Sequence, residues 1–240
     1  DYGRAEIVGG EFSHGKGTVQ AVVNLNQTPL LSMFGPTMGA LKVTIQKFYR
    51  VTGASTQYKG ITPDIVVPDP FGYAESREQD LDYSLKWDQV EKQTFTPWAN
   101  GKFDLDMLKK RSITRVGASA RMKKVIESVE YLTKKRKETL VPISLVEVKA
   151  KDEENQQMTK KLKLEEVNEN ILVADYEESL KSSEGNAIDL KDPKWKKDFE
   201  QRKEEWVKQL RQDPGLEEAL YVADDMVSMY RGQALNLSSK

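Results

Sequence analysis

A lysine stands between two glycines near the start of the chain, in the stretch Gly15-Lys16-Gly17-Thr18-Val19-Gln20. Glycines let other backbone approach the lysine closely, and burial in a desolvated pocket disfavours the charged form of a lysine. A neutral lysine amine can act as a general base. Taken alone, the same stretch also fits a surface turn with a solvated lysine. The chemical interpretation therefore depends on the rest of the sequence.

The residue four positions after the lysine is Gln20. A glutamine amide can accept a hydrogen bond from an amine or donate one to it, without adding a negative charge that would keep the lysine protonated. In one regular strand Lys16 and Gln20 would share a face but lie about 13 Å apart, at ~3.3 Å per residue. We therefore expect a bend between them, either a bulge or a turn, for which the two glycines supply the freedom.

Several blocks within residues 1–68 occur in an order that is typical of one family. These blocks are Asp1-Tyr2-Gly3-Arg4-Ala5, Gly15-Lys16-Gly17-Thr18-Val19-Gln20, Thr44-Ile45-Gln46-Lys47-Phe48-Tyr49-Arg50, Ser55-Thr56-Gln57 and Gly60-Ile61-Thr62-Pro63-Asp64-Ile65. In them the chain resembles the carboxy-terminal processing, or tail-specific, serine peptidases. The resemblance implies a Ser-Lys dyad that cleaves proteins near their C-termini, with Lys16 as the general base and Gln20 as its orienting partner.

The resemblance also implies a nucleophilic serine, which in the family lies a helix upstream of the point where this chain begins. Ser13 is the serine nearest to Lys16, and we interpret it as a turn residue because it precedes the lysine in a predicted loop. The PDZ domain of the family has no counterpart here either. We therefore expect the C-terminal portion of a longer serine endopeptidase, which carries the general base but is inactive alone.

Two features depart from the family's pattern. His14 stands where the family commonly has an aromatic residue, and the loop over residues 9–13 is slightly longer. A histidine beside a base lysine can take part in proton transfer. An exposed or hydrogen-bonded loop histidine has no such role, and the sequence favours this second interpretation.

The composition narrows the classes of function. The chain has 37 basic and 38 acidic residues, a balance that argues against recruitment of nucleic acid or a membrane surface by bulk charge. Without cysteine and with one histidine, disulfides, thiolate metal sites and histidine-based metal centres are excluded, and we predict no cofactor. We find no apolar run long enough to span a bilayer. The family resemblance implies an exported protein of the bacterial periplasm.

The first part of the chain alternates in the manner of β-strands. We predict strands over residues 4–9, 18–25, 41–51 and 64–67. The alternation places Leu41, Val43, Ile45, Tyr49 and Val51 on the side that faces the core. Residues 27–39 contain two prolines and two glycines and are predicted as a loop. Its apolar members, Leu30, Leu31, Met33 and Phe34, either fill the core or line a groove for an apolar substrate tail.

From residue 71 onward the sequence is charged and has a helical period. We predict a helix over residues 75–85, a connector over 87–101, one or two helices over 102–137, a strand over 141–148, a helix over 149–178, a loop over 182–193 and a helix over 195–210. The final helix begins at Asp213-Pro214, with aspartate as N-cap. Its apolar stripe is Leu216, Leu220, Ala223, Val227 and Tyr230. This stripe either packs on the preceding helices or binds a partner.

We therefore predict an α+β fold in which residues 1–70 are a β-rich remnant of the peptidase catalytic core, residues 71–101 a connector, and residues 102–240 a mostly helical C-terminal domain. The helical part resembles, more loosely, the C-terminal extension of the larger tail-specific proteases. Expected partners are unfolded or tagged proteins with apolar C-termini and, on the helical domain, an adaptor protein. The alternative is a non-catalytic scaffold or adaptor-binding module. A buried Lys16 favours the peptidase, and a surface lysine favours the scaffold.

Overall fold

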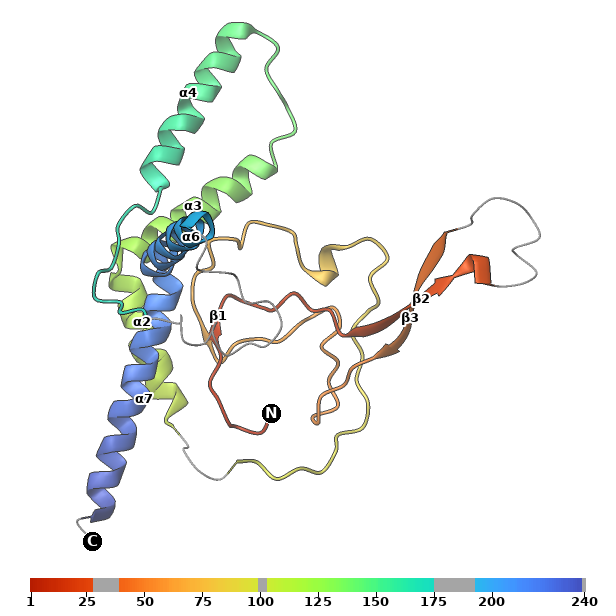
Figure 1. The fold of residues 1–240 in the computed structure, drawn as a ribbon, viewed down its shortest axis with the longest axis vertical. Helices are drawn as coiled ribbons and strands as arrows, with labels where there is room; N and C mark the ends of the chain where they lie inside the picture. The colour runs from red at the N-terminus through yellow and green to blue at the C-terminus, as the bar shows by residue number, and fades with distance from the viewer. Residues whose placement is uncertain (28–38, 99–102, 175–192, 239–240) are drawn as a thin grey trace. The chain divides into compact units, whose positions relative to one another are not determined.

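The computed structural model describes residues 1–27, 39–98, 103–174 and 193–238 (Figure 1). The chain divides into two compact units, one of residues 1–66 and 71–105, the other of residues 67–70 and 106–240. The short strands lie in the first unit and the α-helices begin at its end and continue through the second. The fold is therefore α+β with a mostly helical C-terminal part, as predicted.

The first unit contains two small pairs of strands. β1 (Val8–Gly9) pairs in parallel with β4 (Ile65–Val66), and β2 (Thr18–Asn24) pairs in antiparallel fashion with β3 (Ala40–Lys47). A 3-10 turn, η1 (Leu25–Gln27), follows β2. The four predicted strands are all present, but each is shorter than predicted, the second by one residue only.

The prediction that one face of β3 is buried is wrong. Leu41, Val43 and Ile45 are 52%, 38% and 58% exposed, and Val22 and Val23 on β2 are exposed as well. Tyr49, which follows the strand, is also exposed, whereas Val51 is half-buried. Alternation marks a buried face only where a second layer covers the sheet. Among the described residues, β2 and β3 form a sheet of two strands without such a layer over these side chains.

The helix predicted over residues 75–85 is also wrong. This segment contains one 3-10 turn, η2 (Glu78–Asp80), and Leu81 after it is extended. The side chain of Asp80 accepts a hydrogen bond from the backbone N–H of Arg77, which closes the turn locally. Tyr83 adopts a positive φ of 60°, a conformation that a helix does not allow. Residues 87–98 contain no helix, and they belong to the first compact unit.

Two helices occupy the region predicted as one or two. α2 (Leu105–Ala118) and α3 (Ala120–Arg136) are separated at Ser119, whose hydroxyl accepts a hydrogen bond from the N–H of Met122 and caps α3. Leu108 on α2 and both Met122 and Val125 on α3 are buried. These apolar side chains form part of the core of the helical unit.

The strand predicted over residues 141–148 is wrong, because α4 (Leu145–Leu162) begins inside it. Strand preference depends on a partner strand, and none of the described strands pairs with this segment. The helix predicted over residues 149–178 corresponds to α4 but ends at Leu162. The helix predicted over residues 195–210 is present as α6 (Pro193–Gln212).

The last helix, α7 (Pro214–Ser238), begins at the predicted position. The carboxylate of Asp213 accepts hydrogen bonds from the N–H groups of Gly215 and Leu216, as an N-cap does. The predicted packing stripe is wrong: Leu220, Ala223, Val227 and Tyr230 are exposed, and Leu216 is half-buried. The buried face instead carries Glu218 and Val222.

Ion pairs explain this orientation of α7. Arg115 of α2 pairs with Glu218 at 2.7 Å and with Asp225 at 2.7 Å. Nε and Nη2 of Arg115 both donate hydrogen bonds to Glu218, so this buried carboxylate has hydrogen-bond partners and an opposite charge. The face of α7 that carries Glu218 and Asp225 therefore packs against α2, and part of the apolar stripe is left in solvent.

Some sequence predictions lie outside the described residues, namely the apolar loop residues Leu30, Leu31, Met33 and Phe34 and most of the loop over residues 182–193. Within the described parts, we find no helix with the length and hydrophobicity needed to cross a membrane. No group of three or more histidine, aspartate or glutamate side chains is arranged to hold a metal ion in those same parts.

Candidate functional site

Lys16 lies directly before β2, and Gln20 lies within it. The side chain of Lys16 is exposed and makes no hydrogen bond or ion pair with another described residue, whereas Gln20 is half-buried. Their assignment as general base and orienting partner stays a prediction. We call residues 13–17, which carry the lysine, the lysine turn.

The pairing of β2 with β3 is irregular between Lys16 and Gln20. Val19 stands opposite Gln46 and Gln20 opposite Thr44, so Ile45 is the extra residue of a bulge in β3. A bulge bends the strands and increases their local twist. An irregularity is therefore present beside Gln20, but its extra residue lies on β3 and not at the two glycines that the sequence predicts as the place of the bend.

The lysine turn is fixed by backbone contacts with residues 55–61, which we call the supporting loop. Tyr58 donates its N–H to the carbonyl of Gly15 at 2.7 Å. Gly17 donates its N–H to the side-chain oxygen of Gln57 at 2.8 Å, and Phe48 after β3 donates to the carbonyl of Gly17 at 2.8 Å. Hydrogen bonds therefore fix the backbone on both sides of Lys16, while the lysine side chain is exposed.

The two glycines are required by this close packing. A Cβ at Gly15 would lie 2.8 Å from the carbonyl oxygen of Tyr58, and the φ of Gly15 is +87°. A Cβ at Gly17 would lie 2.4 Å from the backbone nitrogen of Gln57. Both distances are shorter than any ordinary contact, and both atoms belong to the backbone of the supporting loop. The Gly-Lys-Gly pattern therefore reflects how closely this loop approaches the lysine turn.

Ser13, the first residue of the lysine turn, exchanges two hydrogen bonds with Ile61 of the supporting loop. Its hydroxyl accepts a hydrogen bond from the N–H of Ile61 at 2.9 Å, and its own N–H donates to the carbonyl of Ile61 at 3.0 Å. This double contact joins two segments 48 positions apart, so Ser13 has a structural role, but not that of a local turn.

His14 is both exposed and hydrogen-bonded. Its Nδ1 lies 2.7 Å from the carbonyl oxygen of Ser76, and its Nε2 lies 3.6 Å from a carboxylate oxygen of Glu78. The backbone carbonyl of His14 accepts a further hydrogen bond from the N–H of Glu78 at 2.8 Å. These contacts match the loop interpretation and connect the lysine turn to η2.

Matches to two known families together cover almost the whole chain. Residues 71–228 match the family described as the C-terminal domain of tail specific protease. The chain belongs to this family. Residues 1–67 match Peptidase family S41, so the resemblance seen in the first blocks is confirmed as well.

Two curated relatives of the family have similar sequences. A tail-specific protease of Haemophilus influenzae is 29% identical over 164 residues, which are 65% of this chain and 22% of that protein. A carboxy-terminal-processing protease of Bartonella bacilliformis is 41% identical over 70 residues, which are 29% of this chain and 14% of that protein. The matched part of the chain therefore spans less than a quarter of either relative.

Sequence reasoning missed Gln57 and Glu78. Gln57 was visible inside the block Ser55-Thr56-Gln57 but had no role, because its contact with Gly17 joins residues far apart in the sequence. No local pattern marks Glu78, because the helix predicted around it does not form. Gln57 contacts the backbone of Gly17 and Glu78 contacts the backbone of His14, and neither makes a hydrogen bond to the side chain of Lys16.

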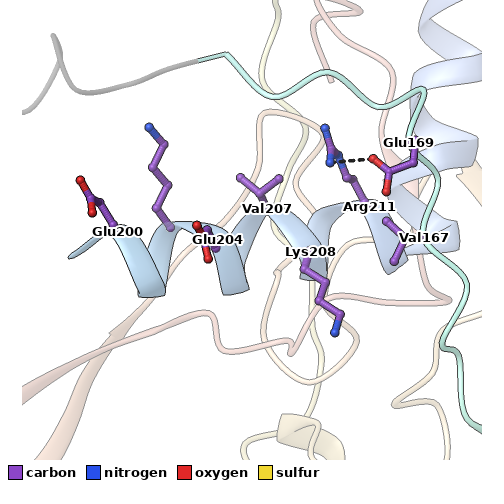
Figure 2. A pocket seen from close by; sticks show the side chains of 8 residues that line it. Val167, Glu169, Glu200, Glu204, Val207, Lys208 and Arg211 are labelled. Carbon is purple, nitrogen blue, oxygen red and sulfur yellow. Dashed lines mark hydrogen bonds and ion pairs between the residues drawn. The ribbon is translucent and has the colours of Figure 1, made fainter. Parts of the chain in front are cut away.

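The helical unit contains a cavity of about 540 Å³ beside α6 (Figure 2). It is lined by Val167, Glu169, Glu200, Lys203, Glu204, Val207, Lys208 and Arg211. Arg211 pairs with Glu169 at 2.9 Å, and Glu200, Glu204 and Val207 follow one another along the helix. The lining has no hydroxyl or thiol that could serve as a nucleophile, and its acidic and basic side chains balance. We assign no chemistry to this cavity.

Proposed function

We propose that this chain is the C-terminal part of a serine endopeptidase that processes or degrades proteins from near their C-termini. In this proposal Lys16 is the general base of a Ser-Lys dyad and Gln20 is its orienting partner. The nucleophilic serine and a PDZ domain belong to the polypeptide upstream, so the chain alone is inactive. The observation that carries the proposal is the Gly-Lys-Gly turn, fixed on both sides of the lysine within the residues that match Peptidase family S41.

The chemistry of the dyad requires a neutral lysine. A lysine in water has a pKa near ~10.4 and is protonated at neutral pH. Desolvation next to the nucleophile disfavours the ammonium, after which the amine takes the proton of the serine hydroxyl during attack and returns it to the leaving amine. Gln20 is suited to hold the amine because its amide adds no charge. The exposed Lys16 of this chain must therefore become covered in the complete enzyme.

The substrates in this proposal are unfolded or tagged proteins with apolar C-termini, and the site of action is the bacterial periplasm. Support comes from the two relatives, whose names describe tail-specific and carboxy-terminal-processing proteases. The family's mode of recognition, in which a PDZ domain pairs with the substrate tail as an added strand, would select such C-termini.

The proposal is tested by cleavage of a disordered peptide with an apolar C-terminus. The full-length protein, including its upstream segment, is compared with residues 1–240 alone. We expect cleavage by the full-length protein and none by the chain alone. A folded full-length protein without peptidase activity would contradict the proposal, and cleavage by the chain alone would show that its nucleophile lies within residues 1–240.

A non-catalytic scaffold is the second candidate, and two observations favour it. Lys16 is exposed in this chain, and Leu140, Val141 and Ile143 between α3 and α4 are almost fully exposed. A groove of about 770 Å³ lies beside them and is lined in part by Tyr131 and Met158. Exposed aliphatic side chains of this kind suit an adaptor protein, as does the outward stripe of α7. Peptidase activity that is lost with Lys16 would exclude a purely non-catalytic role.

A further inference from the structure

We infer that Gln57 and Glu78 are positioning residues for Lys16, which hold the lysine turn in the geometry that proton transfer needs. The inference rests on the proposed function, because it assigns these two side chains to the work of the proposed base. Neither residue touches the amine of Lys16. Their effect is exerted through the backbone of the lysine turn, on the residues that precede and follow the lysine.

Gln57 is fully buried, with 0% of its surface exposed, and every polar atom of its side chain is paired. Its Oε1 accepts from the N–H of Gly17 at 2.8 Å. Its Nε2 donates to Oε1 of Glu78 at 2.7 Å and to the carbonyl of Leu85 at 3.3 Å. A backbone N–H can only donate and a carboxylate oxygen can only accept, so these neighbours allow one orientation of the amide.

Glu78 contacts the other side of the lysine. Its N–H donates to the carbonyl of His14 at 2.8 Å, and its second carboxylate oxygen lies 3.6 Å from Nε2 of His14. The Glu78 side chain is 12% exposed, so the contact with Gln57 is largely shielded from water. One carboxylate and one amide thus connect His14, two residues before Lys16, with Gly17, one residue after it.

The arrangement explains why position 57 carries an amide and not a carboxylate. A glutamate there would still accept from Gly17, but its second oxygen would face the carboxylate of Glu78 at the 2.7 Å that now separates donor and acceptor. Two buried carboxylates at this distance repel one another and cannot both stay ionised. Exchanging the two residue types restores a donor, because a glutamine at position 78 can donate to a glutamate at position 57.

This exchange is the basis of the test. In the full-length protein, kcat, KM and Tm are measured for Gln57→Glu, Glu78→Gln and the double variant. Gln46→Glu on the exposed part of β3 is the matched control. We expect Gln57→Glu to lower kcat on the order of 100-fold with little change in KM, since displacing a reacting group by about 1 Å has such an effect. The control should keep kcat within about threefold. Glu78→Gln keeps an oxygen that accepts from Gln57 but loses the charge that faces His14, so its kcat should fall, though less than that of Gln57→Glu. The double variant should recover at least about tenfold over Gln57→Glu.

A second measurement does not depend on activity. In residues 1–240, amide hydrogen exchange of Gly17 should be slow and should become at least about tenfold faster in Gln57→Glu. If Gln57→Glu fails to fold, Glu78→Leu is used instead; it removes the acceptor of the Gln57 amide without adding charge, and we expect an intermediate loss of kcat, about tenfold.

Three results would overturn the inference. One is unchanged kcat in a folded Gln57→Glu protein, or in Glu78→Leu where that variant replaces it. Another is a double variant no better than Gln57→Glu, and the third is a loss of kcat explained fully by a lower Tm. If Lys16→Ala keeps full activity, the proposed function itself fails. If Lys16→Ala is inactive and Gln57→Glu is not, only the positioning role fails.

Discussion

The N–H of Gly17 donates a hydrogen bond of 2.8 Å to the side chain of Gln57, a residue 40 positions later in the chain. The donor follows Lys16 directly. The supporting loop therefore holds the backbone beside the lysine. This loop is itself held by two hydrogen bonds: Trp87 donates to the carbonyl of Ser55 at 3.0 Å, and Ser55 donates to the carbonyl of Asp88 at 3.1 Å.

Gly17→Ala should destabilise the first unit. The added Cβ would lie 2.4 Å from the backbone nitrogen of Gln57, an atom that cannot move without breaking the supporting loop. We expect a loss of about 1 to 3 kcal/mol in the free energy of unfolding, the usual cost of overpacking. Urea denaturation of both proteins measures this difference.

Gly117→Ala is the control for that substitution. Gly117 lies in α2, and a Cβ there meets no atom within 4 Å. Alanine has the higher helix propensity, so this variant should gain up to about 1 kcal/mol. Equal effects at the two glycines would show that the supporting loop does not pack as described.

Asp225→Asn should destabilise the helical unit, and Asp224→Asn should not. Asp225 is largely buried and accepts hydrogen bonds from Arg111 and Arg115, whereas its neighbour Asp224 is exposed. Hydrogen bonds between charged groups contribute about 1.5 to 3 kcal/mol. We expect a loss of this size for Asp225→Asn and less than about 0.5 kcal/mol for Asp224→Asn, by chemical denaturation at neutral pH.

The same pair of residues predicts how stability depends on pH. Burial raises the pKa of Asp225, but the hydrogen bonds from Arg115 and Arg111 outweigh burial, and the net pKa lies below its ordinary value. An aspartate in the unfolded chain has a pKa near ~3.9. The stabilisation is therefore complete above that pH and is lost as the pH falls through the lower folded pKa.

The stability difference between the parent chain and Asp225→Asn should accordingly be constant from neutral pH to about pH 5 and shrink at more acidic pH. Denaturation curves recorded at a series of pH values measure it. A difference that grows on acidification would contradict the assigned direction of the pKa shift.

Asp213→Ala should remove the N-cap of α7. The carboxylate of Asp213 now accepts from the N–H groups of Gly215 and Leu216, which have no partner within the helix. We expect a loss of about 1 kcal/mol, and a smaller loss for Asp213→Asn, because asparagine is an equally good cap. Thermal unfolding monitored by circular dichroism gives the comparison; similar losses in both variants would argue against a capping role.

Local signals predicted the fold best. The start of α7 at Asp213-Pro214 depends on a cap and the helix that follows it, both of which are visible in a few neighbouring residues. β2 and β3 likewise follow from alternation. Burial followed less well, since it depends on distant partners: Glu218 is buried because Arg115, 103 positions away, neutralises it. Leu41 is exposed because no second layer covers it among the described residues.

The residues of the candidate site also differ in whether neighbouring residues in the sequence are enough to predict them. Lys16 and Gln20 could be proposed from one short motif, since both lie within it. Gln57 and Glu78 could not, because the hydrogen bonds that give them meaning join segments far apart in the sequence and Glu78 belongs to a turn with no distinctive pattern. The two glycines predict a close approach of other backbone, but only the structure shows that this backbone is the supporting loop.

The most direct test of the account is the peptidase activity of the full-length protein with Lys16→Ala, beside the matched control Lys42→Ala on β3, another exposed lysine. Removing an essential catalytic group costs on the order of 2.7 to 4 kcal/mol of transition-state stabilisation, so kcat/KM should fall several-hundred-fold or more. The control should keep full activity. Equal activity of Lys16→Ala and the parent protein would contradict the assignment of Lys16 as the general base.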